Sequence, residues 1–527
     1  MLSTLLWLPL IGALTIALLP EKFDTQQLRR VTASFVAIIL VITVYLLLQF
    51  NLQDSGMQFS EYHRWIEPIG LNYSVGVDGL SLPLIGLNVL LTGLAIYTKD
   101  EQEVKRPKMY YALVLLVNAG VTGALIAQNL LLFVIFYEVE LIPFYLLISI
   151  WGGEKRGYAA MKFLLYTAVS GLLILAAFLG IGFLNPAQSF EYSAISTLDL
   201  SWTAQLVLLG LLLVGFGIKI PLVPLHTWMP DAYVESSPGT AILLGGILAK
   251  LGTYGLVRYG LGLFPETWEV VAPILATIGT VSVLYGALAA IAQRDLKRMV
   301  AYSSIGHMGY ILVATAAGTK LSILGAVSQM ISHGLILALL FYLVGIVERK
   351  AGTRDLDILN GLMNPIRGLP LTSALLIAAG MASAGIPGLV GFPAEFMVFQ
   401  GSFASFPIPT LICIISSGLT AVYFVILLNR TCFGKLDNLR AYYPRTIAVE
   451  RIPALVLTAI VLFLGVQPAW LVRWIQPYSN AIAADLNAFS QPALVQSAVK
   501  KIPPKGEQPI LKVPQNGLLK LPKPNLK

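Results

Sequence analysis

The chain has 527 residues, of which 57% are hydrophobic and only 12% are charged, a composition that excludes an ordinary soluble globular protein and predicts a helical protein with many membrane spans. Two cysteines, Cys413 and Cys432, and four scattered histidines argue against a disulfide framework, an iron–sulfur cluster or a metal site of common spacing. The net charge of +8 lies in connections and near the C-terminus without interleaved aromatic residues, so nucleic-acid binding is not expected.

Apolar segments of roughly 20 residues, the length that crosses a bilayer, recur along the chain. They predict an all-α polytopic membrane protein with about 14 transmembrane helices. The expected spans are 2–20, 31–50, 79–98, 109–127, 129–150, 158–184, 203–225, 238–260, 270–292, 299–317, 322–347, 370–404, 407–429 and 452–466. The first lacks a basic n-region and a small-residue cleavage site, so we expect a span and not a cleaved signal peptide.

Basic residues gather in alternate connections. Those after the expected first, third, fifth, ninth, eleventh and thirteenth spans are rich in Lys and Arg, whereas the others hold little beyond Arg64 and Lys320. Because cytoplasmic connections carry the excess of Lys and Arg, the odd-numbered connections are expected inside and both termini outside the cytoplasm.

Two expected spans are interrupted by Pro and Gly, in GIKIPLVPLHTWMPDA from Gly217 and AGIPGLVGFPAEF from Ala384. Broken helices at membrane depth are tolerated where they line a protein-enclosed or wet cavity. The breaks lie five spans apart, which predicts two five-helix repeats, and an odd number of spans requires the repeats to be inverted. The alternative is a pair of unrelated Pro-kinked helices.

This pattern divides the chain into four parts. Residues 1–108 hold the first three helices, 109–263 the first repeat, 264–430 the second, inverted repeat, and 431–527 the last helix with a C-terminal tail rich in Pro and Lys. The tail, KKIPPKGEQPILKVPQNGLLKLPKPNLK from Lys500, is expected to be extended. It is either a strap that docks on a neighbouring subunit or a plain disordered end.

A few ionisable residues lie deep in apolar sequence and form the candidate site. They are Glu138, Lys219, Lys250, His307, His333 and Glu395. A charge at the bilayer centre costs roughly 2.5–3.5 kcal/mol on insertion scales, so these groups are expected to pair or to line water. A lysine beside a carboxylate keeps its proton and releases it when the carboxylate is neutralised or withdrawn. Histidine can relay that proton with little bias, since its unperturbed pKa is about 6.5.

Structural roles remain open for several of these residues. Glu138 and Lys219 could form a purely structural ion pair, and both site histidines could be hydrogen-bonded packing residues. Glu140, two positions from Glu138, is expected on nearly the opposite face of its helix; one interpretation is a structural role at a subunit contact, and its role otherwise stays open. Two further residues have simpler readings: His226 is expected at the membrane interface, and Asp78 as an N-cap.

At this point the chain resembles a known family over nearly its whole length, to about Gly465. It is similar to the antiporter-like subunits of complex I and of the type I NAD(P)H dehydrogenases of cyanobacteria and plastids, in particular the M-type chain 4 subunits. The segments that carry the likeness are YSVGVDGLS, FYEVELIPFYLLISIWGG, KIPLVPLHTWMPDAYVESSP, GILAKLGTYGLVR, QRDLKRMVAYSSIGHMGY and GIPGLVGFPAEF.

The resemblance implies roles for the candidate residues. Glu138 and Lys219 would form the family's ion pair, and Lys250 would be the central proton carrier. His307 and His333 would lie between Lys250 and Glu395, which would end the exit route. The chain departs from the family at Tyr137, where relatives commonly have Trp, and at Pro393. The first departure leaves in doubt only how the Glu138 carboxylate is packed.

The implied function is proton translocation coupled to quinone reduction. The chain has no GxGxxG after a strand, no cysteine cluster and no haem-like histidine pair, so no cofactor is expected in it and redox chemistry would occur in partner subunits. The partners would be neighbouring antiporter-like membrane subunits. The segment GGEKRGYAAMKFLLYTAVSGLLIL and the tail are similar to the cyanobacterial branch, which implies a thylakoid complex that passes electrons from NAD(P)H or ferredoxin to plastoquinone in photosynthetic electron transport. The two ends of the chain also fit the variant linked to CO2 uptake.

Two other functions stay open. An Mrp-type sodium/proton antiporter subunit shares most of these motifs and has no redox partner. A non-pumping scaffold between membrane subunits is the third possibility, although titratable residues in both halves argue against it.

Overall fold

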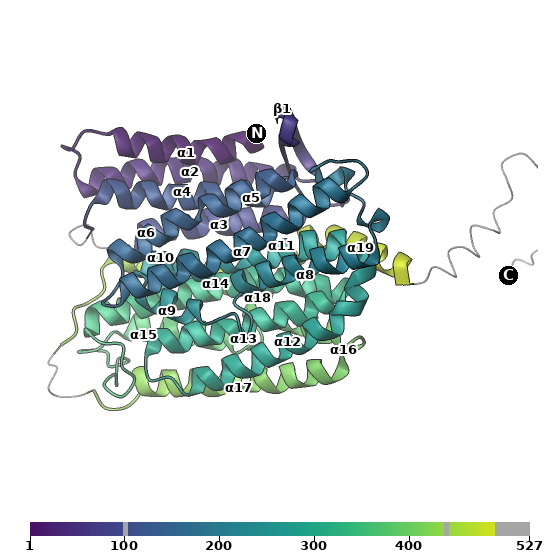
Figure 1. Ribbon diagram of the computed structural model, residues 1–527. Coiled ribbons are helices and arrows are strands. Elements are labelled where there is room, and N and C mark those ends of the chain that lie inside the picture. The colour runs from purple at the N-terminus through teal and green to yellow at the C-terminus, as the bar shows by residue number, and fades with distance from the viewer. Residues whose placement is uncertain (99–103, 437–441, 491–527) are drawn as a thin grey trace, which may run out of the picture.

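The computed structural model describes residues 1–98, 104–436 and 442–490. Most of them form helices whose axes run roughly parallel (Figure 1). The helices of the first part and the first repeat are α1 (Leu2–Leu18), α2 (Thr25–Gln49), α3 (Ser81–Ile96), α4 (Pro107–Ile126), α5 (Leu130–Val139), α6 (Leu141–Trp151), α7 (Arg156–Leu184), α8 (Trp202–Lys219), α9 (Trp228–Glu235), α10 (Pro238–Leu243) and α11 (Ala249–Gly255). Those that follow are α12 (Pro265–Ile291), α13 (Leu296–Ala317), α14 (Lys320–Ala351), α15 (Pro370–Ser383), α16 (Gly391–Phe403), α17 (Pro407–Thr431), α18 (Ala448–Val466) and α19 (Ala469–Ser490).

The membrane class is confirmed by helix length and composition. Among the described residues, 10 helices are long and apolar enough to span a bilayer, and α1, α3 and α15 are shorter apolar helices. Several expected spans consist of more than one helical piece: 129–150 is α5 and α6, and 370–404 is α15 and α16. The total of about 14 spans and the boundaries of the repeats stay predictions.

Two elements of the structure, a β-hairpin and a C-terminal helix, were not expected from the sequence. Strands β1 (Gln58–Ile66) and β2 (Leu71–Val77) form an antiparallel hairpin, closed through the 3-10 turn η1 (Glu67–Ile69) and Gly70 at φ +70. Strand β1 contains Phe59, Tyr62 and Trp65, and aromatic residues are enriched in strands.

Helix α19 is the second unexpected element, because no helix was expected after the span 452–466. Its Leu471, Ile475, Tyr478 and Ile482 are buried, and their spacing is that of one apolar helix face. This face packs on α14 and α12. The tail from Lys500 lies outside the described residues.

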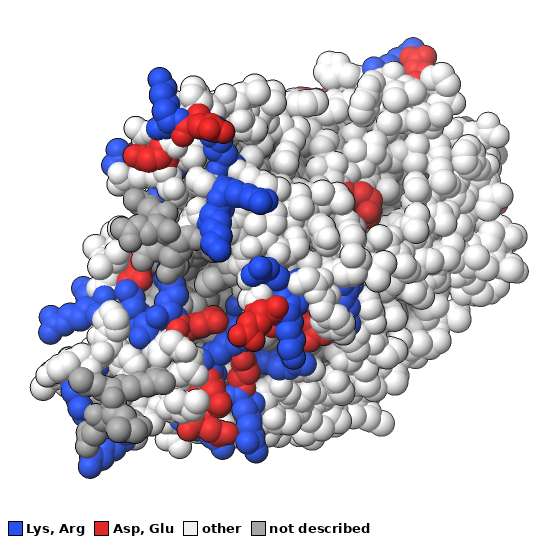
Figure 2. Space-filling view, turned by 60° about the vertical axis from the view of Figure 1, so that its left-hand side comes forward, with Lys and Arg blue, Asp and Glu red and all other residues white. Residues whose placement is uncertain are grey.

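Charged side chains gather at one end of the bundle (Figure 2). Ion pairs there connect the predicted basic connections: Arg354 with Asp295, Arg430 with Asp357, and Lys350 with Glu450. The prediction that alternate connections share an end agrees with these contacts. The cytoplasmic location of this end stays a prediction.

Glycine lets α12 and α13 pack closely against each other. A Cβ at Gly286 would lie 2.6 Å from the backbone nitrogen of Gly306, and one at Gly309 would lie 2.6 Å from the carbonyl oxygen of Gly279. Small residues let membrane helices approach to backbone contact. The site histidine on α13 is therefore held by a rigid helix pair.

Candidate functional site

Two interruptions position the site, at the places where the sequence predicted them. The first lies between α8 and α9, directly after Lys219, and the second between α15 and α16, shortly before Glu395. The first loop is fixed by the Trp228 indole, which donates to the carbonyl of Ile218 at 2.8 Å, and by the backbone N–H of Val223, which donates to the Ser282 hydroxyl on α12 at 3.1 Å.

Lys219 pairs with Glu140. Its Nζ lies 2.6 Å from Glu140 Oε1, and both side chains are fully buried. The Tyr137 ring lies beside the ammonium, with 4.0 Å from Nζ to the ring centroid. A cation over an aromatic face is attracted by the ring quadrupole. Two side chains, Glu140 and Tyr137, therefore stabilise the Lys219 ammonium.

The expected Glu138–Lys219 pair is therefore corrected by the structure. Glu138 and Glu140 do point different ways, but Lys219 approaches the side of Glu140. The Glu138 carboxylate instead lies against Gly171 of α7, where an added Cβ would fall 1.7 Å from Oε1. The helix is interrupted at Glu140, because α5 ends at Val139 and α6 begins at Leu141. Glu140 thus lies at a one-residue interruption of the span, for which Pro143 was a signal, because proline has no N–H to donate to the carbonyl of Val139.

Lys250 is a buried lysine in the bundle core for which the described residues provide no ion pair. It is fully buried, its Nζ donates to the carbonyl of Gly245 at 2.5 Å, and within the described ranges no ion pair joins it to an acid. Two π-helical segments, η5 (Leu244–Leu248) and η6 (Leu256–Leu261), flank its helix α11. Such π turns interrupt regular helical bonding and occur often at functional sites.

The second half of the site joins three helices through His307. The two imidazoles of His307 on α13 and His333 on α14 stack with 5.0 Å between ring centroids. His307 Nδ1 lies 3.3 Å from Glu395 Oε1 on α16, and its Nε2 lies 3.1 Å from the Ser383 hydroxyl at the end of α15. The second break therefore holds both Ser383 and Glu395 against one imidazole.

The six predicted residues thus form three groups. Glu138 and Lys219 lie in the first half, Lys250 lies between the halves, and His307, His333 and Glu395 form one connected cluster.

Sequence reasoning missed several polar partners. Gln329 Nε2 lies 3.3 Å from His307 Nδ1, and Ser417 donates to Glu395 Oε2 at 3.1 Å. Ordinary Ser and Gln residues in apolar helices carry no signal of such contacts. Arg258 did carry a signal in the sequence, since it is a charged residue in the apolar stretch that contains Lys250. In the structure it forms a buried ion pair with Asp78.

Many polar atoms around the second cluster have no protein partner. Among the described side chains these are both ring nitrogens of His333, Gln329 Oε1 and the hydroxyls of Ser304, Ser328 and Ser332. Buried polar groups are nearly always satisfied by protein or by ordered water. Across the described ranges, no group of three or more His, Cys, Asp or Glu side chains could hold a metal ion.

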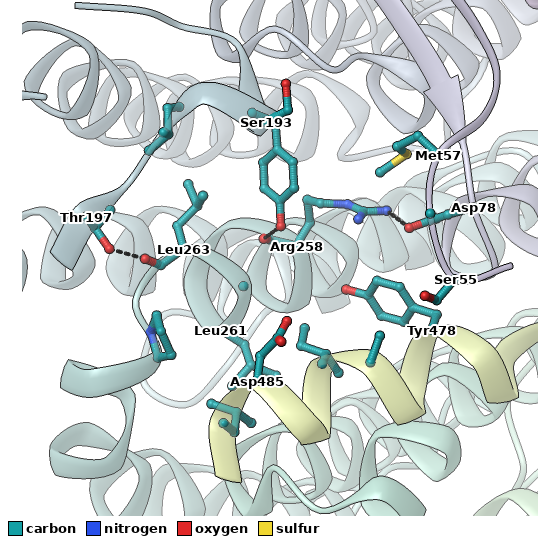
Figure 3. Close-up of a pocket in the computed structure, with 18 of the residues that line it drawn as sticks. Ser55, Met57, Asp78, Ser193, Thr197, Arg258, Leu261, Leu263, Tyr478 and Asp485 are labelled. Carbon is teal, nitrogen blue, oxygen red and sulfur yellow. Dashed lines mark hydrogen bonds and ion pairs between the residues drawn. The ribbon is translucent and has the colours of Figure 1, made fainter. Parts of the chain in front are cut away.

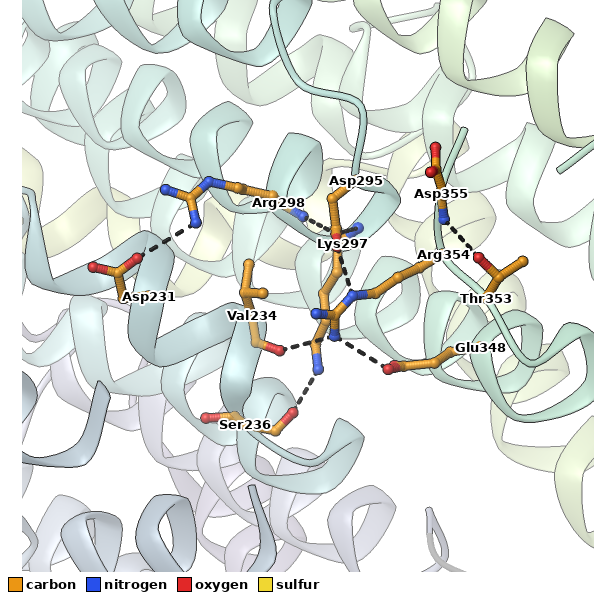
Figure 4. Close-up of polar contacts among 10 residues, drawn as sticks. All are labelled: Asp231, Val234, Ser236, Asp295, Lys297, Arg298, Glu348, Thr353, Arg354 and Asp355. Atoms are coloured by element: carbon orange, nitrogen blue, oxygen red, sulfur yellow. Dashed lines mark hydrogen bonds and ion pairs between the residues drawn. The ribbon is translucent and has the colours of Figure 1, made fainter. Parts of the chain in front are cut away.

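A polar network lies where α9, α13 and α14 meet at the charged end (Figure 4). Arg354 donates to Asp295 at 2.6 Å and to Glu348 at 3.1 Å. Lys297 is 2% exposed, and its ammonium donates to the carbonyl of Ser236. These contacts fix the start of α13, the helix that carries His307.

Comparisons with known proteins agree with this architecture. The model of the family described as NADH:quinone oxidoreductase/Mrp antiporter, TM, matches residues 127–420. The chain is 39% identical to the NAD(P)H-quinone oxidoreductase chain 4 1 of Synechococcus sp. (strain JA-2-3B'a(2-13)), over 94% of each chain. It is 37% identical to chain 4-1 of Synechocystis sp. (strain ATCC 27184 / PCC 6803 / Kazusa), over 94% of this chain and 96% of that one.

Solved structures are similar over the same length. A chain of respiratory complex I from Thermus thermophilus has a TM-score of 0.84 at 27% identity, covering 92% of this chain and 100% of that one. A chain of the Mrp complex from Dietzia sp. DQ12-45-1b has a TM-score of 0.82 at 21% identity, covering 93% of this chain and 98% of that one, which shows a shared fold. The chain belongs to the NADH:quinone oxidoreductase/Mrp antiporter membrane-subunit family and, within it, to the chain 4 subunits of the NAD(P)H-quinone oxidoreductases.

Proposed function

We propose that this chain is a proton-translocating subunit of a complex that reduces plastoquinone with electrons from NAD(P)H or ferredoxin, in a cyanobacterial thylakoid membrane. The relatives reported above are chains of cyanobacterial NAD(P)H-quinone oxidoreductases. The chain would carry no redox cofactor, and partner subunits would reduce the quinone. Neighbouring antiporter-like subunits would be its membrane contacts.

One observation carries the proposal: buried titratable groups recur in both halves of the bundle. The Lys219–Glu140 pair lies in one half and the His333, His307 and Glu395 cluster in the other, with Lys250 between them. Charges this deep are expensive, and in membrane proteins they mark substrate and ion pathways. The unpartnered hydroxyls and imidazole nitrogens near His333 would be bridged by water, which can carry a proton between the groups.

The coupling would be electrostatic. Quinone reduction in a partner would change the charge near Glu140, and the weakened pairing would let the Lys219 proton move toward Lys250 and then to His333. Moving one charge against 100 mV requires about 2.3 kcal/mol. A pKa change of under about two units supplies that much, at about 1.36 kcal/mol per unit.

The test is to replace Lys219 or Lys250 by Ala in the complete complex, reconstituted in sealed vesicles. We expect quinone reduction, measured with an uncoupler present, to continue. Proton uptake per quinone, measured in sealed vesicles without the uncoupler, should fall severalfold or more. Lys320, an exposed lysine at the start of α14, offers a control: Lys320→Ala should pump normally. Full pumping by both site variants would contradict the proposal.

A sodium/proton antiporter is the competing function, since the Mrp chain shares the fold. The identity of over a third to the quinone oxidoreductase chains, along nearly the whole chain, favours the redox-coupled complex. Purification of the chain together with iron–sulfur subunits would support it, and purification with antiporter subunits alone would favour the alternative.

A further inference from the structure

Two adjoining cavities lie beside α19 at the β-hairpin end of the bundle, and they differ in charge. The first, of about 560 Å³, is lined by Arg258 together with the carboxylates of Asp78 and Asp485 (Figure 3). Arg258 Nη2 lies 2.5 Å from Asp78 Oδ2, and both side chains are at most 4% exposed. The guanidinium of this cavity is therefore compensated, and no positive charge is left over for a ligand.

The second cavity has an uncompensated positive charge. Its volume is about 660 Å³, and it is lined by α19 from Arg473 to Ala481 and by residues 52, 53 and 55, which come shortly before β1. Among the described lining residues Arg473 is the one charged side chain, and none is Asp or Glu. The other polar lining groups are neutral, namely the amides of Gln53, Gln476 and Asn480 and the hydroxyl of Ser55. An anion is therefore the kind of ligand that this cavity attracts.

Arg473 is held in place by aromatic rings and not by an acid. Its guanidinium carbon lies 3.8 Å from the centroid of the Trp470 ring and 4.9 Å from that of the Trp474 ring. No ion pair or hydrogen bond joins this guanidinium to another described residue, and its buried Nε has no partner. Stacking on indoles orients the guanidinium plane. The N–H groups of its two Nη atoms stay available for the oxygens of a phosphate, which a guanidinium binds in bidentate geometry.

The course of α18 places this cavity at a membrane boundary. Glu450, in the first turn of α18, pairs with Lys350 at the charged end, and the helix then runs to Val466. Its 19 residues span about 28 Å at a rise of about 1.5 Å per residue, which is close to the roughly 30 Å of a hydrocarbon core. Helix α19 begins at Ala469, so it starts at the opposite boundary. Trp side chains such as those beside Arg473 are enriched at this depth.

An exposed apolar surface leads from the cavity into the membrane. Phe463 and Val466 of α18 are 49% and 65% exposed. The Phe463 ring lies 6.0 Å from the ring of Trp470, on which the Arg473 guanidinium stacks. A positive charge at the boundary with an apolar surface beside it matches the two parts of an anionic lipid, the headgroup and the acyl chain.

Asn480 specifies the headgroup further. Its side-chain oxygen is buried and has no partner among the described residues. Buried acceptors are nearly always satisfied by a donor, so a ligand that completes this site brings a hydroxyl group as well as a negative charge. Phosphatidylglycerol has both, because its phosphodiester carries a glycerol with two free hydroxyls.

We propose that the second cavity binds the headgroup of an anionic membrane lipid that also carries hydroxyl groups, as phosphatidylglycerol does, in the leaflet on the β-hairpin side. Arg473 donates to two oxygens of the phosphodiester, and a headgroup hydroxyl donates to Asn480 Oδ1. An acyl chain lies along Phe463 and Val466. The bound lipid connects α19 to the segment before β1. This proposal does not depend on proton translocation.

Protection of a cysteine in the complete complex tests the site. Gln476 is exposed and lines the cavity, whereas Ala484 is exposed on the same helix outside it. In a complex whose Cys413 and Cys432 are replaced by Ser, we expect Gln476→Cys to react about tenfold more slowly with a neutral maleimide in nanodiscs of phosphatidylglycerol than in nanodiscs of phosphatidylcholine. Ala484→Cys should react equally fast in both. Mass spectrometry of the alkylated peptide measures the rates.

Substitutions within the site identify the groups that bind. We expect Arg473→Gln to remove the difference between the two lipids, and Arg64→Gln, which changes a 75% exposed arginine of β1, to preserve it. Arg473→Lys keeps the charge without the planar fork and should retain part of the protection; it takes the place of Arg473→Gln if that variant does not assemble. Phosphatidylmethanol, which has the same charge and no headgroup hydroxyl, should protect less than phosphatidylglycerol, and Asn480→Leu should make the two lipids equal.

The same measurements can overturn the proposal. Equal labelling of Gln476→Cys in phosphatidylglycerol and phosphatidylcholine does so, whether the cysteine is open in both or covered in both by a neighbouring protein. Full protection by free glycerol 3-phosphate in phosphatidylcholine nanodiscs assigns the cavity to a soluble anion and overturns the lipid. Undiminished protection in both Arg473 variants overturns the role of the guanidinium. Because no readout uses pumping, these failures leave the proposed function intact.

Discussion

At the residue scale, the most consequential contact is the fully buried pair of Lys219 and Glu140. Removing two ions from water costs several kcal/mol each, and their mutual attraction repays this only when the geometry is good. The distance of 2.6 Å and the Tyr137 ring at 4.0 Å from the ammonium both favour the charged forms. Because Glu140 and Tyr137 alone stabilise the Lys219 ammonium among the described contacts, a change of charge nearby would alter its protonation, as a coupling site requires.

Replacing Glu140 and Glu138 separately by Gln distinguishes the two acids. We expect Glu140→Gln to leave the Lys219 charge uncompensated, an effect worth about 3–5 kcal/mol when one partner of a buried pair is removed. Lys219 would then lose its proton, and proton uptake per quinone would fall. Glu138→Gln should have the smaller effect, because its carboxylate contacts Gly171 and not Lys219. Proton uptake in vesicles is the measurement, and the reverse order of effects would contradict the pairing.

At the element scale, the interruptions between α8 and α9 and between α15 and α16 hold the site residues Lys219 and Glu395 inside the bundle. The second break depends on close backbone packing, because a Cβ at Gly391 would lie 2.0 Å from the carbonyl oxygen of Ala382. Helix α18 supports it from outside, since the N–H of Val390 donates to the carbonyl of Val461 at 3.1 Å. This packing sets the position of Glu395 against His307.

Gly391→Ala should therefore destabilise the break. The added methyl group meets backbone and not a flexible side chain, so we expect a loss of about 1–3 kcal/mol, seen as a lower midpoint of thermal unfolding in the purified complex. Gly418→Ala is the matched control, because that glycine lies on α17 with nothing within 4 Å of an added Cβ. It should be neutral or stabilising by up to about 1 kcal/mol, the helix propensity of Ala over Gly. Equal midpoints for the two variants would show that the break tolerates the extra volume.

At the scale of the whole molecule, the charged end and the β-hairpin end do different work. The charged end ties distant segments together: Arg354 contacts Asp295 before α13, Glu348 near the end of α14 and the carbonyl of Val234 on α9. The hairpin end contains the cavity beside Arg258 (Figure 3).

Arg354→Ala tests the charged end. It removes one guanidinium from two carboxylates and a carbonyl, and because the side chain is 27% exposed we expect a loss of about 1–2 kcal/mol of stability, not the larger figure of a fully buried pair. Arg294→Ala is the control, since Arg294 is 82% exposed and its contact with Asp357 is 3.4 Å long; its effect should be within about 0.5 kcal/mol of zero. Thermal unfolding of the complex measures both. A larger loss for Arg294→Ala would contradict the assignment of the network.

Much of the fold followed from the chain because membrane length and hydropathy are local properties. The spans, the breaks after Lys219 and before Glu395, and the shared end of the basic connections are all readable from short windows. Helix α19 was missed because its apolar residues occupy only one face, so the segment as a whole is not as hydrophobic as a membrane span. The β-hairpin was missed because it is a short extramembrane insertion in a sequence dominated by helices.

The sequence by itself determined which residues carry the buried charge, because an ionisable group in an apolar run is visible without any neighbour. Only the tertiary structure decided which of them meet. Lys219 pairs with Glu140 and not Glu138, His307 gathers Ser383 and Glu395 from both sides of a break, and Arg258 closes the floor of a cavity with Asp78. The physical reason is that partners lie on different helices, and the rotation of each helix is set by packing across the whole bundle and not by local sequence.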